Sequence, residues 1–155
     1  PDYQRLRQIP GIGPITVLTV FAEAGDLRRF GHHRQFLKFC GLDLATYQSG
    51  QFRGHAKLSK FGNARLRRAF WIAAQVAIRQ PDNSFRAKYE RYIARDRDNT
   101  DLERKAVTAI TAKMARTAHA ILKSGADYRP FFEGSMPSRR PLSASAVRAH
   151  PRSCR

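Results

Sequence analysis

The sequence has few of the residues that mark secreted, membrane-spanning or metal-binding proteins. Its two cysteines, Cys40 and Cys154, lie far apart and match no metal or redox spacing, so no oxidising compartment is indicated. No apolar run approaches the roughly 18 residues of a membrane span, and the longest, 15–22, is broken by Thr16 and Thr19. No signal peptide is visible. These absences predict a protein without a membrane partner.

Acidic residues are also scarce, since 12 Asp and Glu stand against 29 Lys and Arg and give a formal net charge of +17. Such an imbalance indicates a polyanionic partner. A metal-dependent nuclease needs several converging carboxylates, and the acids here are scattered apart from one cluster over 96–103. That cluster is explained by the start of a helix, so we predict no metal site on this chain. Walker-type loops and Gly-x-Ser-x-Gly elbows are absent.

Hydrophobic residues make up 42% of the chain, enough for one folded core. Apolar side chains recur at helical spacing, and we predict an all-α fold. A helix-hairpin-helix is followed by a third helix, a long basic loop and three further helices. The expected helices cover about 2–8, 15–24, 31–40, 63–79, 85–96 and 100–124. We place the domain at 1–134 and a disordered Arg/Ser/Pro-rich tail at 135–155, because the tail has no acidic residue and cannot bury a core.

Capping residues support these boundaries. Asn63 is expected to cap the fourth helix, and Gly41 and Gly125 are expected to end the third and the last. The sequence Thr100-Asp101-Leu102-Glu103 predicts a capping box with Thr100 as the N-cap residue. Cys40 lies in an apolar stretch and is interpreted as a small buried hydrophobe.

The stretch Ile9-Pro10-Gly11-Ile12-Gly13-Pro14 predicts a hairpin between the first two helices, 2–24. Gly11 and Gly13 lack a Cβ atom, so the backbone can turn tightly and approach another molecule closely. Pro14 suits the first turn of the following helix. The free N–H groups at that helix start form an anion site, which fits a DNA phosphate without reading sequence.

The segment 41–61 has no helical period, and long loops in compact domains are often functional. Ser49 lies in it beside Gly50, and basic side chains follow closely. A serine can attack a DNA phosphate if it loses its proton and cations stabilise the developing charge. The candidate phosphate-binding residues are therefore the two hairpin glycines and five cations, Arg53, Lys57, Lys60, Arg65 and Arg68. His55 or a lysine could accept the serine proton.

Residues 6–122 resemble the carboxy-terminal domain of bacterial insertion-sequence transposases of the one-ten and one-sixteen type, which are bridge-RNA-guided recombinases. The matching motifs are the hairpin sequence, Phe39-Cys40-Gly41-Leu42, Ser49-Gly50, Leu58-Ser59-Lys60-Phe61-Gly62-Asn63 and Leu66-Arg67-Arg68. The order of the Gly-Leu, Ser-Gly and Ser-Lys-x-Gly-Asn motifs is more specific than the hairpin alone. Two details depart from the common pattern: Cys40 precedes Gly-Leu, and 43–45 lacks a frequent proline.

The resemblance implies that Ser49 is the nucleophile of a covalent serine–DNA intermediate in strand exchange. It also implies an amino-terminal domain with acidic magnesium ligands, for which this sequence has no counterpart. Magnesium is thus expected only with that domain. DNA, a guide RNA and further copies of the same chain in a synaptic complex are the implied partners, and the bacterial cytoplasm, at the nucleoid, is the implied location. Because the chain starts at Pro1, we interpret it as a piece of a longer or trimmed protein. Without the amino-terminal domain, we expect it to be inactive in isolation.

Two alternatives remain open. A non-catalytic helix-hairpin-helix module that grips DNA would show the same charge and the same hairpin. An inactive remnant of a mobile element would keep the motifs without activity. The Ser49-Gly50 and Ser59-Lys60-Phe61-Gly62-Asn63 patterns favour the transposase interpretation, because a pure binding module has no need of them.

Overall fold

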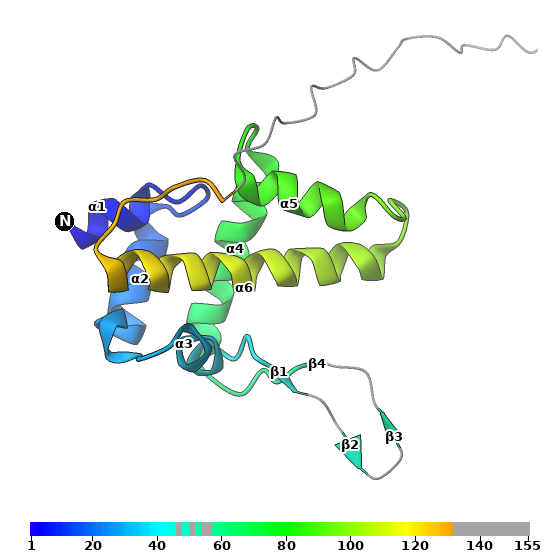
Figure 1. The fold of residues 1–155 in the computed structure, drawn as a ribbon, viewed down its shortest axis with the longest axis horizontal. Coiled ribbons are helices and arrows are strands. Elements are labelled where there is room, and N and C mark those ends of the chain that lie inside the picture. Colours follow the sequence, from blue (N-terminus) through cyan, green and yellow to red (C-terminus); the bar gives the residue numbers. More distant parts are fainter. Residues whose placement is uncertain (46–47, 50–51, 54–56, 132–155) are drawn as a thin grey trace, which may run out of the picture.

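The computed structural model describes residues 1–45, 48–49, 52–53 and 57–131, and from 45 to 57 only backbone pairing is described. Within these residues, six α-helices form the body of the molecule (Figure 1), as the sequence predicted. They are α1 (Asp2–Arg7), α2 (Pro14–Ala24), α3 (His33–Cys40), α4 (Ala64–Arg79), α5 (Ser84–Ile93) and α6 (Thr100–Ser124), with a 3-10 helix, η1 (Leu27–Arg29), between α2 and α3. The predicted tail, 135–155, lies outside the described residues.

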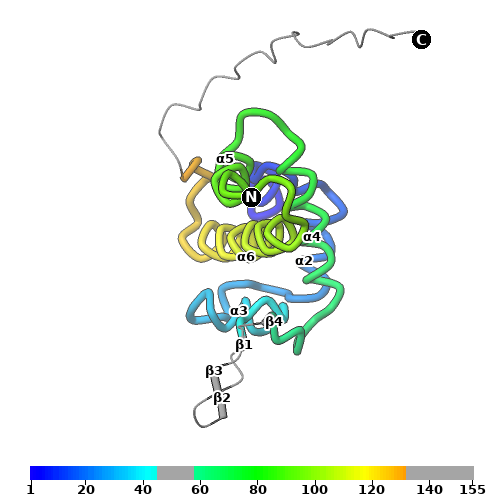
Figure 2. The backbone as a smooth tube through the Cα atoms, turned by 90° about the vertical axis from the view of Figure 1, so that its right-hand side faces the viewer, coloured from blue at the N-terminus to red at the C-terminus, as the bar shows by residue number. Residues whose placement is uncertain are grey.

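The long helix α6 is the centre of the packing. It contacts α1, α3, α4, α5 and η1, and α4 crosses it on one side while also contacting α2. Figure 2 shows α5 and α3 on opposite sides of α6. α2 is thus held to the body through α4 and α1, whereas α1, α3, α4 and α5 pack on α6 directly.

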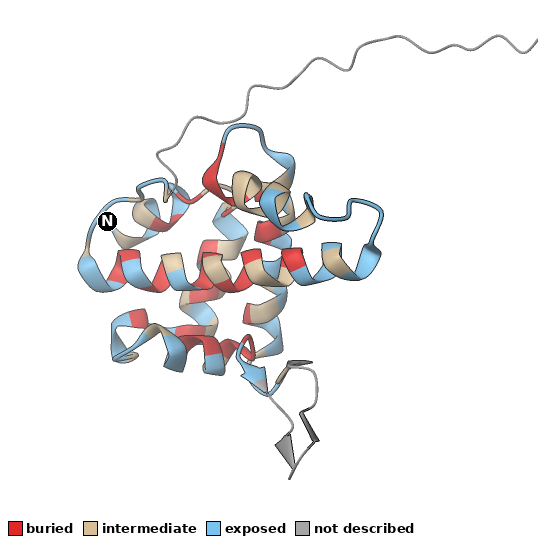
Figure 3. Cartoon of the chain, turned by 45° about the vertical axis from the view of Figure 1, so that its right-hand side comes forward, coloured by how far each residue is buried: buried red, intermediate tan, exposed pale blue. Residues whose placement is uncertain are grey.

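The core is built from apolar side chains that recur at helical spacing. Leu66, Phe70, Ala73 and Ala77 of α4 are buried. On α6, Ala106, Ile110, Met114 and Ile121 are buried, whereas Leu102 and Thr117 are half-buried. Figure 3 shows buried positions along most of the length of α6, alternating with exposed ones. Apolar burial of this kind is the main favourable term in folding.

Most predicted helix ends are confirmed. The Asn63 side chain accepts a hydrogen bond from Leu66 N at 3.0 Å, and Gly41 and Gly125 adopt the left-handed conformation at their helix ends. The predicted capping box at Thr100 is wrong. Asn99 is the N-cap, because its side-chain oxygen accepts from both Asp101 N and Leu102 N at 3.1 Å.

The segment 41–61 is not wholly irregular, which corrects the prediction of a plain loop. It contains four two-residue strands, β1 (Leu44–Ala45), β2 (Gln48–Ser49), β3 (Phe52–Arg53) and β4 (Lys57–Leu58). β1 pairs antiparallel with β4, and β2 with β3. We call this segment the arm. Strands of two residues are too short to show the alternating pattern that reveals a strand in sequence.

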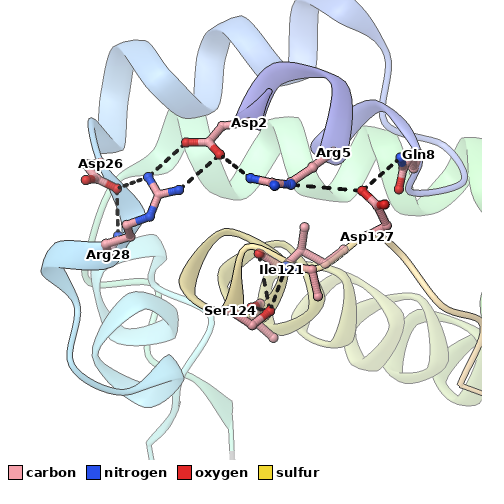
Figure 4. Close-up of polar contacts among 10 residues, drawn as sticks. Asp2, Arg5, Gln8, Asp26, Arg28, Ile121, Ser124 and Asp127 are labelled. Atoms are coloured by element: carbon pink, nitrogen blue, oxygen red, sulfur yellow. Dashed lines mark hydrogen bonds and ion pairs between the residues drawn. The ribbon is translucent and has the colours of Figure 1, made fainter.

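Polar contacts join α1 to η1 and to the segment that follows α6 (Figure 4). Asp2 accepts hydrogen bonds from Arg28 of η1 at 2.9 and 3.0 Å and from Arg5 at 3.1 Å. The Arg28 guanidinium, above all, holds the pKa of Asp2 below its usual value. Asp127, beyond α6, accepts from Gln8 at 3.3 Å. The helix before the hairpin is therefore anchored at both ends.

Candidate nucleic-acid interface

The connection between α1 and α2 is a tight turn whose geometry explains its sequence. Ile12 N donates to Ile9 O at 3.0 Å, and the two central residues are Pro10 and Gly11, with φ +86° at Gly11. Proline followed by a residue of positive φ is the pattern of a type II turn. Ile9 and Ile12 are buried, 1% and 5% exposed, so the turn is pinned to the core by its flanking side chains.

The two glycines of the turn have different surroundings. A Cβ atom on Gly11 would lie 2.2 Å from Ala73 O and 2.8 Å from Ala77 N, both on α4. Gly11 thus makes the close approach predicted for it, but to a helix of its own chain. A Cβ atom on Gly13 would meet nothing within 4 Å. Gly13 is the glycine that leaves open space in front of the turn.

α2 begins at that open space. Its N-cap is Gly13, which has no side chain that could accept from the first N–H groups. Pro14 lies in the first turn, as predicted. Within the described residues, no backbone acceptor is found for Ile15 N or Thr16 N. Unsatisfied N–H groups and the helix dipole together favour an anion at this position.

A groove of about 660 Å³ runs from the turn to the exposed face of α4. We call it the hairpin groove. Its lining joins the predicted hairpin and two of the predicted cations in one site: Gly11, Gly13, Pro14, Ile15, Thr16, Thr19, Arg65, Arg68, Ala69, Ile72 and Val76. Four of the predicted phosphate-binding residues, Gly11, Gly13, Arg65 and Arg68, therefore surround the same space.

The two arginines of the groove differ in their partners. Arg65 forms an ion pair with Glu23 of α2 at 3.0 Å, although its side chain is 82% exposed. Glu23 also accepts from Asn63 Nδ2 at 2.7 Å, and these two donors, Asn63 first, hold the pKa of Glu23 below its usual value. For Arg68, no side-chain partner is found within the described residues. Arg68 is consequently the groove cation most available to a phosphate.

The base of the arm brings together motifs that are distant in sequence. Asn63 N donates to Phe39 O at 2.7 Å, and Ser59 N donates to Asp43 O at 2.9 Å. Arg67 Nη1 reaches across to Cys40 O at 3.3 Å and Lys60 O at 3.1 Å. The Gly-Leu and Ser-Lys-x-Gly-Asn motifs thus meet and close the arm against α3 and α4.

Glycine is required at this closure. A Cβ atom on Gly62, where φ is +144°, would lie 2.5 Å from Phe39 O and 2.6 Å from Gly41 N. Cys40 beside it is fully buried, as predicted, and burial raises the pKa of its thiol to about 12. The thiol is therefore a packing group at neutral pH. Much of the motif that resembles the family has this structural role.

The arm carries the remaining candidate residues. Ser49 is the last residue of β2 and pairs with Phe52, while Arg53 of β3 pairs with Gln48. Lys57 of β4 pairs with Ala45 near the base, and Lys60 lies at the base itself, exposed and with φ +56°. His55 and Gly50 lie outside the described residues. Ser49, Arg53 and Lys57 thus all belong to the arm, whereas the hairpin groove is lined by the turn, α2 and α4.

A second cationic region lies along α6, and the grouping of its lysines and arginines with two histidines was not predicted from the sequence. A groove of about 680 Å³ is lined by His32, His33 and several α6 side chains, including Lys113 and Arg116. Burial, together with the nearby charge of Arg116, lowers the pKa of Lys113, and burial together with the charges of His32 and Arg116 lowers that of His33. No sequence signal groups these residues, because about 80 positions separate the two segments.

Two classes of feature are not found in the described part of the chain. No group of three His, Cys, Asp or Glu side chains that could hold a metal ion occurs there. The magnesium implied by the family resemblance therefore does not fit these residues. Nor does any described helix have the length and apolar character needed to cross a membrane.

Comparison with known proteins gives a consistent result. Residues 3–90, more than half of the chain, match the family described as Transposase IS116/IS110/IS902 family. The matched range includes the hairpin groove and the whole arm. The family resemblance deduced from the motifs is thereby confirmed.

Curated relatives match over stretches of similar or greater length. The transposase for insertion sequence element IS1111A of Coxiella burnetii is 37% identical over 82 residues, which are 53% of this chain and 22% of that protein. The probable family 20 transposase of Pseudomonas aeruginosa is 33% identical over 127 residues, 82% of this chain and 37% of that protein. The insertion element IS110 uncharacterized 43.6 kDa protein of Streptomyces coelicolor is 27% identical over 139 residues, 90% of this chain and 32% of that protein. The chain thus spans 22–37% of the length of these relatives.

Proposed function

This chain belongs to the IS116/IS110/IS902 family of transposases, and from that premise we propose that it is the DNA-binding, serine-nucleophile domain of such an enzyme. The observation that carries the proposal is the joint presence, within residues 3–90, of a cation-lined groove and of an arm that bears Ser49. The first gives a means of holding DNA, and the second gives a nucleophile on an element closed at its base by the family motifs.

In this proposal, duplex DNA lies along the hairpin groove and is held through its phosphates. The N–H groups at the start of α2 donate hydrogen bonds to one phosphate oxygen, and Arg68 neutralises a neighbouring phosphate. Arg65 adds charge while paired with Glu23. Contacts of this kind fix the position of the duplex but read no bases, so we expect binding with little sequence preference.

The proposed chemistry is attack by Ser49 Oγ on a DNA phosphorus atom. A bond forms between Oγ and phosphorus, and the bond from phosphorus to one deoxyribose oxygen breaks. The Oγ proton passes to His55 or to a lysine in its neutral form, and the departing oxygen takes up a proton. Arg53, Lys57 and Lys60 are the arm cations proposed to stabilise charge on the phosphoryl oxygens.

Strand exchange in this proposal requires more than the chain itself. Because the chain spans 22–37% of its relatives, an amino-terminal domain with acidic magnesium ligands, a guide RNA and further copies of the chain are proposed as partners. The chain alone is expected to bind DNA without recombining it.

Covalent protein–DNA adducts provide the test. The chain is joined to the amino-terminal domain of a family transposase, supplied with guide RNA and DNA sites, and Ser49→Ala is compared with Ser59→Ala. We expect Ser49→Ala to abolish the adduct while DNA binding persists. If the adduct survives Ser49→Ala and disappears with Ser59→Ala, the nucleophile is Ser59. If neither substitution changes the adduct while DNA is bound, the serine mechanism is wrong for this chain.

A further inference from the structure

Trp71 is exposed although it lies in the middle of α4. It is the chain's single tryptophan, and 46% of it is accessible to solvent. The buried stripe of α4 passes through Leu66, Phe70 and Ala73 and does not include it. About half of this large aromatic side chain is therefore open to a partner, and its surroundings decide which partner fits.

Trp71 lines a cavity of about 430 Å³ between α4, α6 and the base of the arm. Leu42, Leu58 and Ala64 provide apolar wall, and Thr108 and Thr111 provide hydroxyl groups. Each hydroxyl already donates to a backbone oxygen of α6, at 2.9 and 2.8 Å, so towards a ligand it can only accept. The size and the mixture of apolar wall and few polar groups are typical of a small-ligand site.

The cavity shares a cation with the hairpin groove. Arg68 lines both spaces and stands three positions before Trp71, on the same side of α4. Arg67, four positions before Trp71, also lines the cavity while it holds the arm base. A nucleic acid strand that leaves the hairpin groove past Arg68 would therefore meet the tryptophan next.

We propose that this cavity receives one unstacked nucleobase of single-stranded DNA, with Trp71 as the stacking surface and Arg68 on the adjoining phosphate. This inference rests on the proposed function, since it places the base beside the arm that carries Ser49. An aromatic side chain next to a basic path is how proteins hold single strands without sequence preference. The bases of an intact duplex are stacked on both faces, so the site selects DNA that has opened locally.

The fluorescence of Trp71 reports on this site directly, because the chain has no other tryptophan. The parent chain is titrated with an oligothymidine of about 12 nucleotides and, separately, with a duplex. We expect the single strand to quench the tryptophan emission and the duplex to quench it far less. Trp71→Ala should weaken single-strand binding about 5- to 100-fold, with duplex affinity nearly unchanged. Trp71→Phe should recover part of the loss.

Tyr92→Ala is the matched control, since Tyr92 is similarly exposed, at 41%, but lies on α5 and does not line the cavity. It should leave both affinities as in the parent. If the single strand binds without quenching the parent, the inference is wrong even though the proposed DNA binding stands, and a protein partner becomes the better candidate for this surface. If neither DNA binds, the proposed function itself fails. The parent titration decides even where a substitution unfolds the chain.

Discussion

Gly11 and Gly13 show how one motif can serve packing and binding through different residues. Gly11 has positive φ and touches the backbone of α4, whereas Gly13 has φ −89° and faces open space. The sequence predicts a tight turn from these residues but cannot say which glycine approaches what. The partner of Gly11 lies about 60 positions away, and only the tertiary structure supplies it.

Valine substitutions at the two glycines separate these roles. Gly11→Val should lower the free energy of unfolding by about 3 kcal/mol or more, because the side chain is strained at positive φ and overlaps Ala73 O. Gly13→Val should melt like the parent but weaken binding to all duplexes alike, because the new side chain covers the start of α2. Thermal melting and fluorescence anisotropy measure the two effects.

Gly31→Val is the control for this pair. Gly31 is exposed and precedes α3, and a Cβ atom added there would meet only the flexible end of Gln35, at 3.6 Å. It should change neither stability nor DNA affinity. Duplex affinity that stays at the parent value in Gly13→Val would exclude the start of α2 as a phosphate site.

Glu23 is a residue whose role no sequence pattern reveals, since its partners Asn63 and Arg65 are 40 and 42 positions away. Its pKa in the folded chain is below the usual value of 4.5. The folded state therefore binds fewer protons than the unfolded state as the pH falls through this range. The stabilisation is complete above about pH 5 and is lost as the pH falls through the lowered pKa.

Glu23→Gln should consequently flatten the acid side of the stability profile. Urea unfolding midpoints measured between about pH 3 and 7 should fall less steeply towards acid in the variant than in the parent. Asp43→Asn, at an exposed carboxyl group on the arm, is the control and should keep the parent slope. Equal slopes in Glu23→Gln and the parent would mean that the contacts with Asn63 and Arg65 do not persist in solution.

At the scale of elements, the helices and the arm were predictable to different degrees. The helices show clear periods, as over Leu66, Phe70 and Ala73, so their type and order were predictable, although the N-cap of α6 was placed one residue too late. The arm was predicted as a loop because strands of two residues leave no pattern. The closure of its base was also invisible, since it depends on hydrogen bonds from Arg67 and Asn63 to backbone oxygens of α3 and of the arm base.

The base of the arm yields a prediction for Arg67. Arg67→Met keeps an apolar stem but removes the donors to Cys40 O and Lys60 O. Loss of these bonds should speed hydrogen exchange at Ser59 N and Asn63 N by about 10- to 100-fold. Arg68→Met, the neighbouring change, should leave exchange at both amides as in the parent. Unchanged exchange in Arg67→Met would show that the arm is closed by other contacts.

At the scale of the whole molecule, a net charge of +17 is distributed over at least two faces. The hairpin groove and the α6 groove share no lining residue. The net charge indicates an anionic partner, but the sequence does not show how the charge divides, because Arg68 and Arg116 look alike in a helix pattern. Their division follows from how α4 and α6 cross.

The claim on which the rest depends is that the hairpin groove holds DNA by its phosphates. The most direct measurement is the affinity of the chain for a short duplex between about 50 and 200 mM salt, in the parent, in Arg68→Gln and in Arg95→Gln, an exposed arginine away from the groove. With about six to ten phosphate contacts, the parent affinity should fall by roughly 10³ to 10⁵. Arg68→Gln should reduce the slope of log affinity against log salt by about 1, and Arg95→Gln should not. Binding that barely responds to salt, or an equal effect of the two substitutions, would contradict the claim.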